Sequence, residues 1–575
     1  MSTFAIRTRY FRLLAALLLA SIASPKFASA QADAQQVKAN PKPAVPVAAD
    51  RKQKQVLSTI ETDAYVAKLS NLNGGLVSFK LKDARYQKGG APIDMVTTDR
   101  EAYLPLSIEL MGVEVPEAAL WRAEKLPKGG VRMTLDADGV RVTRKYEVGQ
   151  GPYQLWLTTT IQNNGARVRK VAVKTKTFHY ALRSDEKSAI PFLPVRSPWM
   201  SQGLCYHDDE VTREDRSALV DEPVAAKKVT FAGAENVYFL NAIAPHGEAA
   251  ERCDLVASER GRDADGEALG TLFETSVSYQ ARTLAPAAST TLTEMAYLGP
   301  KTPEALAAAG HRLGESIDGG WFSALSKLLT LLLRMIFEVL GNWGLAIIVL
   351  TLIVKSALYP LTAKQMKSMA KMKELKPEMD RINELYADDR ERKGAATMEL
   401  YREKGVNPMA GCFPMLIQLP IWFSLYASLS TNIELLHAPF VGWLADLSSP
   451  DPYFVLPLAL GVLMFVQQKM TPASGMDPAQ QKMMLYMMPS MMMAFMLFLP
   501  AGLCLYMFTN SALSIGQQRL IEAQLTRLNS HAGTSSSPSS PPAQEPGTVA
   551  TSGETVGRPR VTRMTKAERR LRRGR

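Results

Sequence analysis

Five apolar segments crowd into residues 343–521, and they constrain the fold more than any other feature of the chain. They are residues 343–361, 412–429, 453–470, 483–499 and 503–521. Each has roughly 17–20 residues, the length at which an α-helix crosses a hydrocarbon core of about 30 Å. A segment in lipid must satisfy its own backbone polar groups, which helices do. The sequence therefore predicts a helical membrane domain over residues 343–526.

The charges between the spans predict how they are oriented. The connection 362–410 is rich in Lys and Arg, whereas the connection 430–452 contains Glu434, Asp446 and Asp451 but neither basic residue. The positive-inside rule places the basic connection in the cytoplasm, together with a disordered basic tail over residues 527–575. We therefore predict a multi-pass protein of the cell inner membrane. Since five spans are an odd number, residue 320 lies outside the cytoplasm.

The N-terminus has the features of an export signal. Arg7, Arg9 and Arg12 precede an apolar stretch that is too short to span, and Ala28-Ser29-Ala30 fits a cleavage site. The sequence predicts a signal peptide over residues 1–30, with an uncleaved anchor as the alternative. Residues 31–55 are rich in Ala, Gln, Pro and Lys and predict a linker.

Residues 56–300 alternate apolar and polar side chains, as half-buried strands do. In residues 130–146 the alternation is interrupted at Asp138-Gly139, a hairpin turn signal. Many short strands at such spacing predict a periplasmic β-sandwich. We find no catalytic motif there. Cys205 and Cys253 are open to a disulfide in an oxidising compartment, and the sequence does not decide this.

A connecting region over residues 301–342 precedes the membrane domain. Residues 302–318 predict a short helix, and residues 321–340 predict an amphipathic one. In the second, Lys327 and Arg334 share a face opposite a largely apolar one. A long apolar helix with a basic stripe lies in the membrane interface more readily than it spans.

Lys355 lies inside the first predicted span. A cation near the bilayer centre costs about 2.5–3.5 kcal/mol on insertion scales, so we expect it to face protein or water. The alternative is that it snorkels to the cytoplasmic interface. Neutral polar residues of other spans could complete a wet, positively charged recess, or could serve only in helix packing. Those that we select, besides Thr351 in the same span, are Gln418, Asn510 and Gln517.

The predicted spans contain no acidic residue, which argues against a proton-coupled pump. The recess also offers no groups for covalent or acid–base chemistry. The sequence predicts no enzyme activity, no cofactor, no nucleotide and no metal. A solute transporter or channel is the alternative function, although we see no inverted repeat that would support it. A structural envelope scaffold is a second alternative, which deletion of the β-domain would test.

The basic connection predicts a cytoplasmic helical hairpin over residues 364–405. Apolar side chains recur there at three- and four-residue steps, Pro377 restarts the first helix, and Gly405 ends the second. A solvated pair of helices would look the same. The functional interpretation is a docking face for partners or a nascent chain, formed by Met366, Met369, Met372 and Met379.

At these residues the chain closely resembles the YidC-type membrane protein insertases. The resemblance is strong over residues 335–525 and weaker in the β-rich half, where it rests on Asn73-Gly74-Gly75. The motifs that carry it are Gly341-Asn342-Trp343-Gly344, Tyr359-Pro360-Leu361-Thr362, Ser368-Met369-Ala370-Lys371-Met372, Asn407-Pro408, Gly411-Cys412-Phe413-Pro414-Met415-Leu416-Ile417-Gln418-Leu419-Pro420-Ile421, Ala438-Pro439-Phe440, Asp446-Leu447-Ser448, Asp451-Pro452-Tyr453 and Pro500-Ala501-Gly502-Leu503.

The resemblance implies an α+β membrane protein with a periplasmic β-supersandwich and a five-helix core. The core would enclose a hydrophilic groove that is closed to the periplasm, and the cytoplasmic hairpin would be needed for activity. Lys355 aligns with the family's groove arginine, and Thr351, Tyr506 and Met507 align with residues along which substrate helices slide. The implied partners are nascent membrane proteins, the lipid bilayer and the Sec translocon, with the ribosome as a further candidate for the hairpin and the tail.

The chain departs from the family pattern in three places. Lys355 stands where the family has Arg, and an ammonium lacks the guanidinium fork. Met507 replaces the second residue of a frequent Tyr-Tyr pair. The N-terminal segment resembles a cleavable signal, whereas Gram-negative members usually keep it as an extra span.

Overall fold

The computed structural model describes residues 56–98, 101–116, 119–186, 197–263, 266–387, 389–405, 409–470 and 481–533. The predicted signal peptide and linker lie outside these residues, as does most of the predicted tail. The chain divides into two compact units, Met1–Ile521 and Glu522–Arg575, and the first holds the strands and most of the helices.

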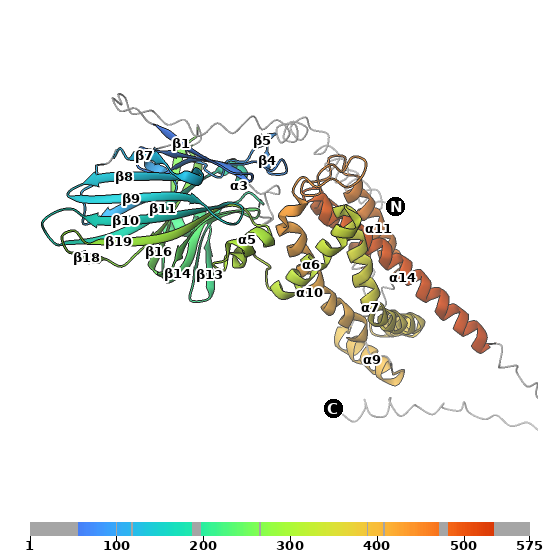
Figure 1. The fold of residues 1–575 in the computed structure, drawn as a ribbon. Coiled ribbons are helices and arrows are strands. Elements are labelled where there is room, and N and C mark those ends of the chain that lie inside the picture. The colour runs from blue at the N-terminus through green and yellow to red at the C-terminus, as the bar shows by residue number, and fades with distance from the viewer. Residues whose placement is uncertain are drawn as a thin grey trace, which may run out of the picture. The chain divides into compact units, whose positions relative to one another are not determined.

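Residues 57–300 form three antiparallel sheets (Figure 1). The small sheets are β1 (Leu57–Glu61), β2 (Tyr65–Ser70) and β3 (Leu76–Leu81), and β4 (Gln87–Lys88) with β5 (Ala91–Pro92). The main path of the large sheet is β18 (Arg282–Leu284), β11 (Arg169–Leu182), β17 (Ala268–Ser278), β16 (Ala250–Arg262), β14 (Val224–Glu235), β15 (Phe239–His246), β19 (Ser289–Pro300), β10 (Gln154–Asn163), β9 (Val140–Val148), β8 (Val131–Ala137) and β7 (Arg122–Lys125). Off this path, β12 (Gln202–His207) pairs with β13 (Glu210–Glu214) and β14, and β6 (Ser107–Met111) pairs with β11.

The hairpin of β8 and β9 illustrates how the sequence specifies these sheets. Ala137 pairs with Val140 across the turn, and the two turn residues have φ values of 48° at Asp138 and 72° at Gly139. Two positive φ angles match the right-handed twist of the flanking strands. Buried and outward side chains then alternate along β8, so one face joins the domain's apolar core. The predicted hairpin is confirmed.

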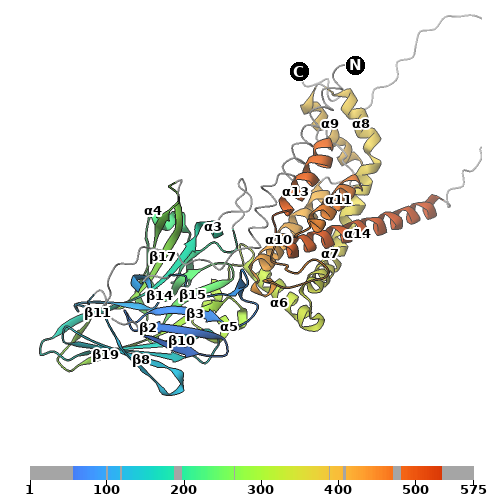
Figure 2. The ribbon, with the colours of Figure 1, turned by 90° about the horizontal axis from the view of Figure 1, so that it is seen from above.

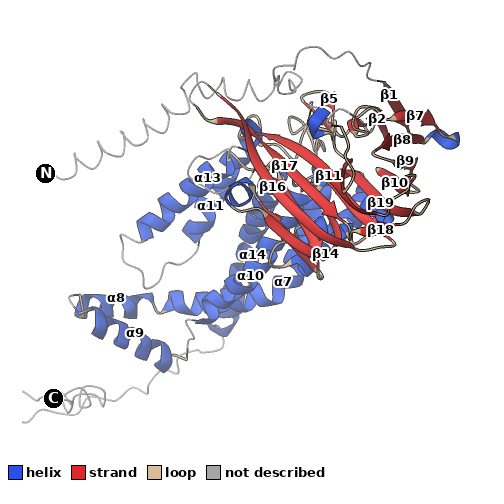
Figure 3. Ribbon diagram, turned by 90° about the vertical axis from the view of Figure 1, so that its left-hand side faces the viewer, coloured by secondary structure: helices blue, strands red, loops and turns tan. Residues whose placement is uncertain are grey.

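Short helices accompany the strands, and a helical region follows them (Figure 3). The short elements are η1 (Glu101–Tyr103), η2 (Pro127–Gly129), α3 (Arg183–Glu186), α4 (Arg216–Asp221), α5 (Pro303–Ala309) and η3 (Leu313–Ser316). The later ones are α6 (Ser323–Leu340), α7 (Trp343–Glu374), α8 (Lys376–Leu385), α9 (Arg390–Glu403), α10 (Met409–Thr431), η4 (Ile433–Leu435), α11 (Val455–Met470), η5 (Met483–Met487), α13 (Met488–Met496) and α14 (Ala501–Gly533).

All five predicted spans fall on helices, but their bounds differ. α7 continues beyond residue 361 to Glu374 because the residues that follow are good helix formers and the next stop signal is Pro377. α14 continues to Gly533, past the predicted start of the tail. Among the described residues, one helix is long and apolar enough to cross a membrane, Trp343–Ser368, and two shorter apolar helices follow it.

The predicted hairpin is built from the end of α7, α8 and α9, which Figure 2 shows at one end of the bundle. α8 begins at Lys376, with Pro377 in its first turn, where a missing N–H costs nothing. Gly405 follows α9 with a φ of 65°, a conformation that glycine adopts without strain. The restart of the helix at Pro377 and the end at Gly405 are as predicted, but no separate helix begins near residue 364, because α7 continues from the preceding span.

α6 has two apolar faces rather than one. Its inner face places Leu329 and Leu333 in the core of the helix bundle, against α7 and α10. The outer stripe is exposed and consists of Leu328, Leu331, Met335 and Val339. The two basic residues do not form a free stripe, because Lys327 lies 3.6 Å from Glu315 and Arg334 pairs with Glu304. These ion pairs connect α6 to η3 and α5.

Candidate functional site

Lys355 turns toward α14 from the middle of the apolar part of α7. Its Nζ donates a hydrogen bond of 2.8 Å to Oγ of Ser514, which in turn donates to the carbonyl oxygen of Asn510 at 2.7 Å. The side chain of Gln517 donates through Nε2 to the carbonyl oxygen of Lys355 at 3.4 Å. The cation therefore lies against a polar stretch of a neighbouring helix.

Tyr506 lies on the same face of α14 as Gln517, about three helical turns nearer the start of the helix. Its side chain is 2% exposed, and its hydroxyl interacts with the side chain of Gln418 on α10. Thr351 is also 2% exposed, and its hydroxyl donates to the carbonyl of Ile347 at 2.7 Å within α7. Neighbouring side chains cover Thr351 and Tyr506 in this conformation, so a substrate helix could reach them only if these neighbours moved.

Met507 contacts α10 through its sulfur. The indole Nε1 of Trp422 donates to Met507 Sδ at 3.3 Å. The contacts of Lys355, Tyr506 and Met507 described above form a polar seam between α7, α10 and α14. We use that name for the residues Lys355, Gln418, Tyr506, Met507, Asn510, Ser514 and Gln517.

The seam contains an unsatisfied polar atom. Gln517 Oε1 is buried, and it has no hydrogen-bond partner among the described residues. A buried amide oxygen costs free energy unless a donor reaches it, so water or a donor of a bound chain would stabilise it. The seam therefore offers one unsatisfied hydrogen-bond acceptor.

Two seam contacts were not selected from the sequence. Ser514 lies four residues after Asn510 and three before Gln517, so these three residues share one face of α14. That spacing would have identified Ser514. Trp422 gave no comparable signal, because an apolar aromatic residue in a span is expected anyway.

The predicted docking residues of the hairpin are distributed differently. Met379 is 3% exposed and accepts a hydrogen bond from the hydroxyl of Tyr401 at 3.2 Å, so it packs inside the hairpin. Met366 is half-buried on α7. The side chains of Met369 and Met372 lie outside the described set. The apolar side chains that the hairpin exposes include Leu385 and Met398 instead.

The groups that line the polar seam are mostly neutral. The seam supplies one cation, hydroxyls, amides and a thioether, without the paired titratable groups that acid–base catalysis requires. Among the described residues no group of three His, Cys, Asp or Glu side chains could hold a metal ion.

Three titratable side chains of the β-domain are buried or half-buried, namely His179, Cys205 and Cys253. His179 is half-buried, contacts Ser201 and Thr97, and has its pKa lowered to about 4 by burial and by the nearby Lys88. Cys205 and Cys253 are buried free thiols. The hydrogen bond with Cys205 and burial raise the pKa of Cys253 well above its ordinary value. The bridge left open by the sequence is absent between these two residues.

The comparisons with known families cover both halves of the chain. The family described as 60Kd inner membrane protein matches residues 335–528. The family described as YidC periplasmic domain matches residues 57–332.

Curated relatives extend this match across most of the chain. The membrane protein insertase YidC of Haemophilus ducreyi is 33% identical over 490 residues, which are 82% of this chain and 87% of that protein. The protein of the same name from Geobacter metallireducens is 33% identical over 493 residues, 84% of this chain and 88% of that protein.

Solved structures are more distant. A crystal structure of an active YidC insertase covers 81% of this chain and 92% of that chain, with 17% identity and a TM-score of 0.34. A galactose mutarotase-like protein from Lactobacillus casei covers 42% of this chain and 100% of that chain, with 10% identity and a TM-score of 0.29.

Proposed function

Because the chain belongs to the YidC family of membrane protein insertases, we propose that it passes the polar flanks of incoming segments along the seam between α7, α10 and α14. As a member of that family it is an inner-membrane protein with a periplasmic β-domain. Its clients are membrane proteins that enter the lipid bilayer.

The topology that we propose has five spans, with α8, α9 and the C-terminal tail in the cytoplasm. The basic connection 362–410 and the acidic connection 430–452 support it through the positive-inside rule. The polar seam then lies within the membrane domain, and its Lys355 end is nearer the cytoplasm. A client would enter from that side.

The energetic problem for a client is its polar flank and not its apolar segment. An apolar segment gains about 0.8 kcal/mol for each CH₂ group that leaves water. The flank loses hydration instead, and charged groups lose the most. A seam that offers hydrogen-bond partners partway across would replace part of that hydration and lower the barrier.

Lys355 would select acidic flanks in this process. Its partner Ser514 is neutral, so the ammonium charge is not cancelled by the contact that holds it. A positive charge in a medium of low polarity attracts a carboxylate more strongly than it would in water. The Lys355–Ser514 contact is the observation on which this proposal rests.

The proposed partners beyond the client are the Sec translocon and the ribosome. The exposed Leu385 and Met398 of the hairpin, with the basic tail, would contact them on the cytoplasmic side. No nucleotide, cofactor or metal takes part in the proposal, since the client's own burial drives the step.

Site-specific photo-crosslinking of a stalled nascent chain tests the proposal. A photoreactive residue at Met507 or Gln517 should crosslink to the polar flank of the client. The matched control is Val462 on α11, which is 64% exposed and lies outside the seam. Crosslinking at Val462 that equals crosslinking at both seam positions would refute the proposed path.

A further inference from the structure

The loop between α10 and α11 joins the ends of several helices. Its backbone accepts hydrogen bonds from the start of α14, where Ala501 N lies 2.8 Å from Ser449 O and Gly502 N lies 2.9 Å from Leu447 O. It also meets the start of α7, where Asn342 Nδ2 donates to the carbonyl of Phe440 at 3.0 Å. The loop thus covers the end of the bundle at which α7 and α14 begin.

The same loop caps α11 as well. Asp451 accepts a hydrogen bond of 2.7 Å from the backbone N–H of Leu456 and one of 3.0 Å from the indole of Trp443. A carboxylate at a helix N-terminus satisfies N–H groups that the helix leaves unpaired. We call residues 438–451 the seal, because they connect the starts of three helices at the end of the bundle away from Lys355.

The residues just before the seal belong to the core of the β-domain. Ile433 and Leu436 are 2% and 5% exposed, and both pack in the same apolar cluster as Tyr86 and Phe239 of the β-domain. His437 follows them, and its Nε2 lies 3.0 Å from the carbonyl oxygen of Gln87 on β4. These three residues, 433, 436 and 437, form the anchor.

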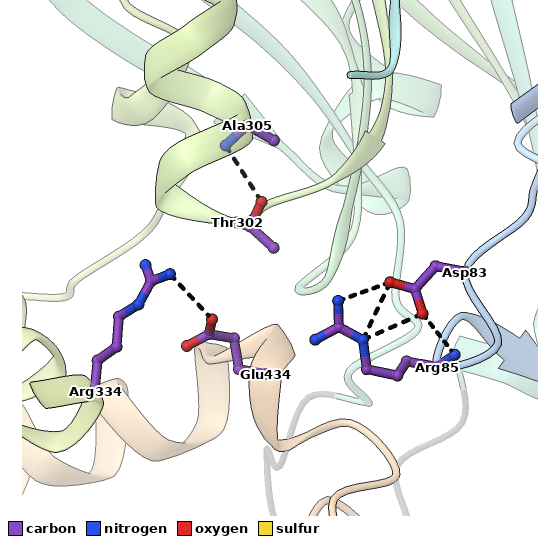
Figure 4. Close-up of polar contacts among 6 residues, drawn as sticks. All are labelled: Asp83, Arg85, Thr302, Ala305, Arg334 and Glu434. Atoms are coloured by element: carbon purple, nitrogen blue, oxygen red, sulfur yellow. Dashed lines mark hydrogen bonds and ion pairs between the residues drawn. The ribbon is translucent and has the colours of Figure 1, made fainter. Parts of the chain in front are cut away.

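Charged side chains surround the anchor. Arg334 of α6 points toward Glu434, with a separation of 3.8 Å (Figure 4). Arg334 also pairs with Glu304 of α5. Asp83 and Arg85 of the β-domain lie beside this group and pair with each other at 2.7 Å. Burial raises the pKa of Glu434, and Arg334 and Arg85 oppose that rise. Both basic residues therefore attract the Glu434 carboxylate.

We propose that the β-domain clamps the periplasmic seal of the insertase by holding the anchor, which is Ile433, Leu436 and His437. A loop with few regular hydrogen bonds would open more readily than the helices that it covers. Fixing its first residues in a folded β-domain removes that freedom before a client arrives. The β-domain thereby keeps the non-cytoplasmic end of the seam closed while the other end accepts the client's flank.

The proposal rests on the proposed function only for the side of the membrane on which the seal lies. It makes a separate statement about the β-domain, namely that the domain controls closure and not insertion itself. Removal of the anchor should therefore expose the interior of the bundle from the periplasmic side, whereas insertion of clients should continue.

Cys504 provides a native reporter of closure. It lies in the first turn of α14 beneath the seal, is buried, and places its Sγ 3.4 Å from the carbonyl oxygen of Met496. We would replace the other three cysteines, which are Cys205, Cys253 and Cys412, and add a membrane-impermeant maleimide to the periplasmic face of the full-length protein in spheroplasts.

The anchor variant is Ile433→Ser with Leu436→Ser. It should raise the labelling rate of Cys504 at least tenfold. The matched control is Val441→Ser, in the same loop but 62% exposed, which should leave the rate unchanged. A milder variant, Arg334→Gln, should raise the rate by about twofold to fivefold, and it answers the objection that the double variant misfolds.

Each outcome bears on the clamp. Unchanged labelling in both the anchor variant and Arg334→Gln would overturn it, and equal acceleration by Val441→Ser would do so too, because any disturbance of the loop would then suffice. Client insertion is measured in parallel in proteoliposomes. Loss of seam crosslinking with intact anchor effects would reject the proposed path but leave the clamp standing.

Discussion

The ammonium nitrogen of Lys355 lies 2.8 Å from the hydroxyl oxygen of Ser514, so a charge on α7 is held by a neutral side chain on α14. A carboxylate in the position of Ser514 would have cancelled that charge. A hydroxyl orients the ammonium group without neutralising it, and the proposed function uses this uncancelled charge to attract an acidic group of a client.

Replacement of Lys355 should therefore affect clients according to the charge of their flanks. We expect Lys355→Ala to lower insertion of a client with an acidic flank by about tenfold, because a hydrogen bond to a charged group contributes roughly 1.5–3 kcal/mol. Lys355→Arg should retain most activity, and Ser514→Ala should lose about twofold to threefold. Insertion into proteoliposomes of paired clients, with acidic and neutral flanks, measures this. Equal insertion by Lys355→Ala and the unmodified protein would remove the role of the charge.

The second prediction concerns Gly344, which packs against Phe440 of the seal. A Cβ atom at this position would lie 2.1 Å from Cδ2 of the Phe440 ring, too close for any real contact. We expect Gly344→Ala to displace Phe440 and to destabilise the protein by about 1–3 kcal/mol, the usual cost of overpacking. Gly394 on α9 is the control, since a Cβ there meets open space and alanine favours a helix. Melting temperatures of the full-length protein should fall for Gly344→Ala and hold or rise for Gly394→Ala.

The sequence predicted the elements better than it predicted the contacts between them. The hairpin at Asp138-Gly139 and the helix start near Pro377 follow from local backbone preferences, so they could be predicted from the sequence. The ends of α7 and α14 could not be predicted, because the residues that follow their apolar parts continue the helix without a stop signal.

Only those residues of the site that charge or helical spacing distinguishes could be predicted from the sequence. Lys355 was selected because a cation inside an apolar segment is costly, but its partner Ser514 is 159 residues away. The anchor had no signal at all, since Ile433 and Leu436 look like ordinary apolar residues of a loop. Their burial depends on the β-domain, and no local pattern encodes a contact of that range.

A buried ion pair joins the β-domain to the connecting region. Lys301 and Glu235 are 6% and 5% exposed, their charged atoms are 2.7 Å apart, and Lys301 also donates to the carbonyl of Ser316. Breaking such a pair leaves a buried charge, so we expect Lys301→Met to cost about 3 kcal/mol. Arg213, 2.8 Å from Glu235, limits the loss.

The double variant Lys301→Met with Glu235→Leu completes this test. It should recover part of the lost stability, because it removes both charges and not only one. Thermal unfolding of the full-length protein measures the cycle. This account would be contradicted if the double variant lost more unfolding free energy than the two single variants lose together.

The anchor should also respond to pH through His437. Its hydrogen bond with Asp446, at 3.0 Å, raises the pKa of His437, and the Gln87 carbonyl adds to this. Burial would raise the pKa of Asp446, but hydrogen bonds from His437, Ser448 and Ser449 outweigh it, so that pKa is lowered. Among the described residues, Tyr238 of the β-domain is a further titratable group close enough to interact with Asp446.

The two shifts fix a pH window. A raised histidine pKa gives stability that is fully present below the ordinary value of about 6.5 and is lost as the pH rises through the folded-state pKa. A lowered aspartate pKa gives stability that is present above about 3.9 and is lost as the pH falls through the folded-state pKa. The contact between His437 and Asp446 should thus be strongest between about pH 4 and 6.5, and it should weaken in mildly alkaline solution.

Hydrogen exchange of the full-length protein measures that loosening. Amides of β4 and of the loop 432–449 should lose protection between pH 6 and pH 8.5, after correction for the intrinsic exchange rate. His437→Gln should abolish the pH dependence, whereas His246→Gln, an exposed histidine of the β-domain, should preserve it. If His437→Gln retained the full pH dependence, another group would have to be responsible. Tyr238 could not be that group, because burial raises its pKa further above this pH range.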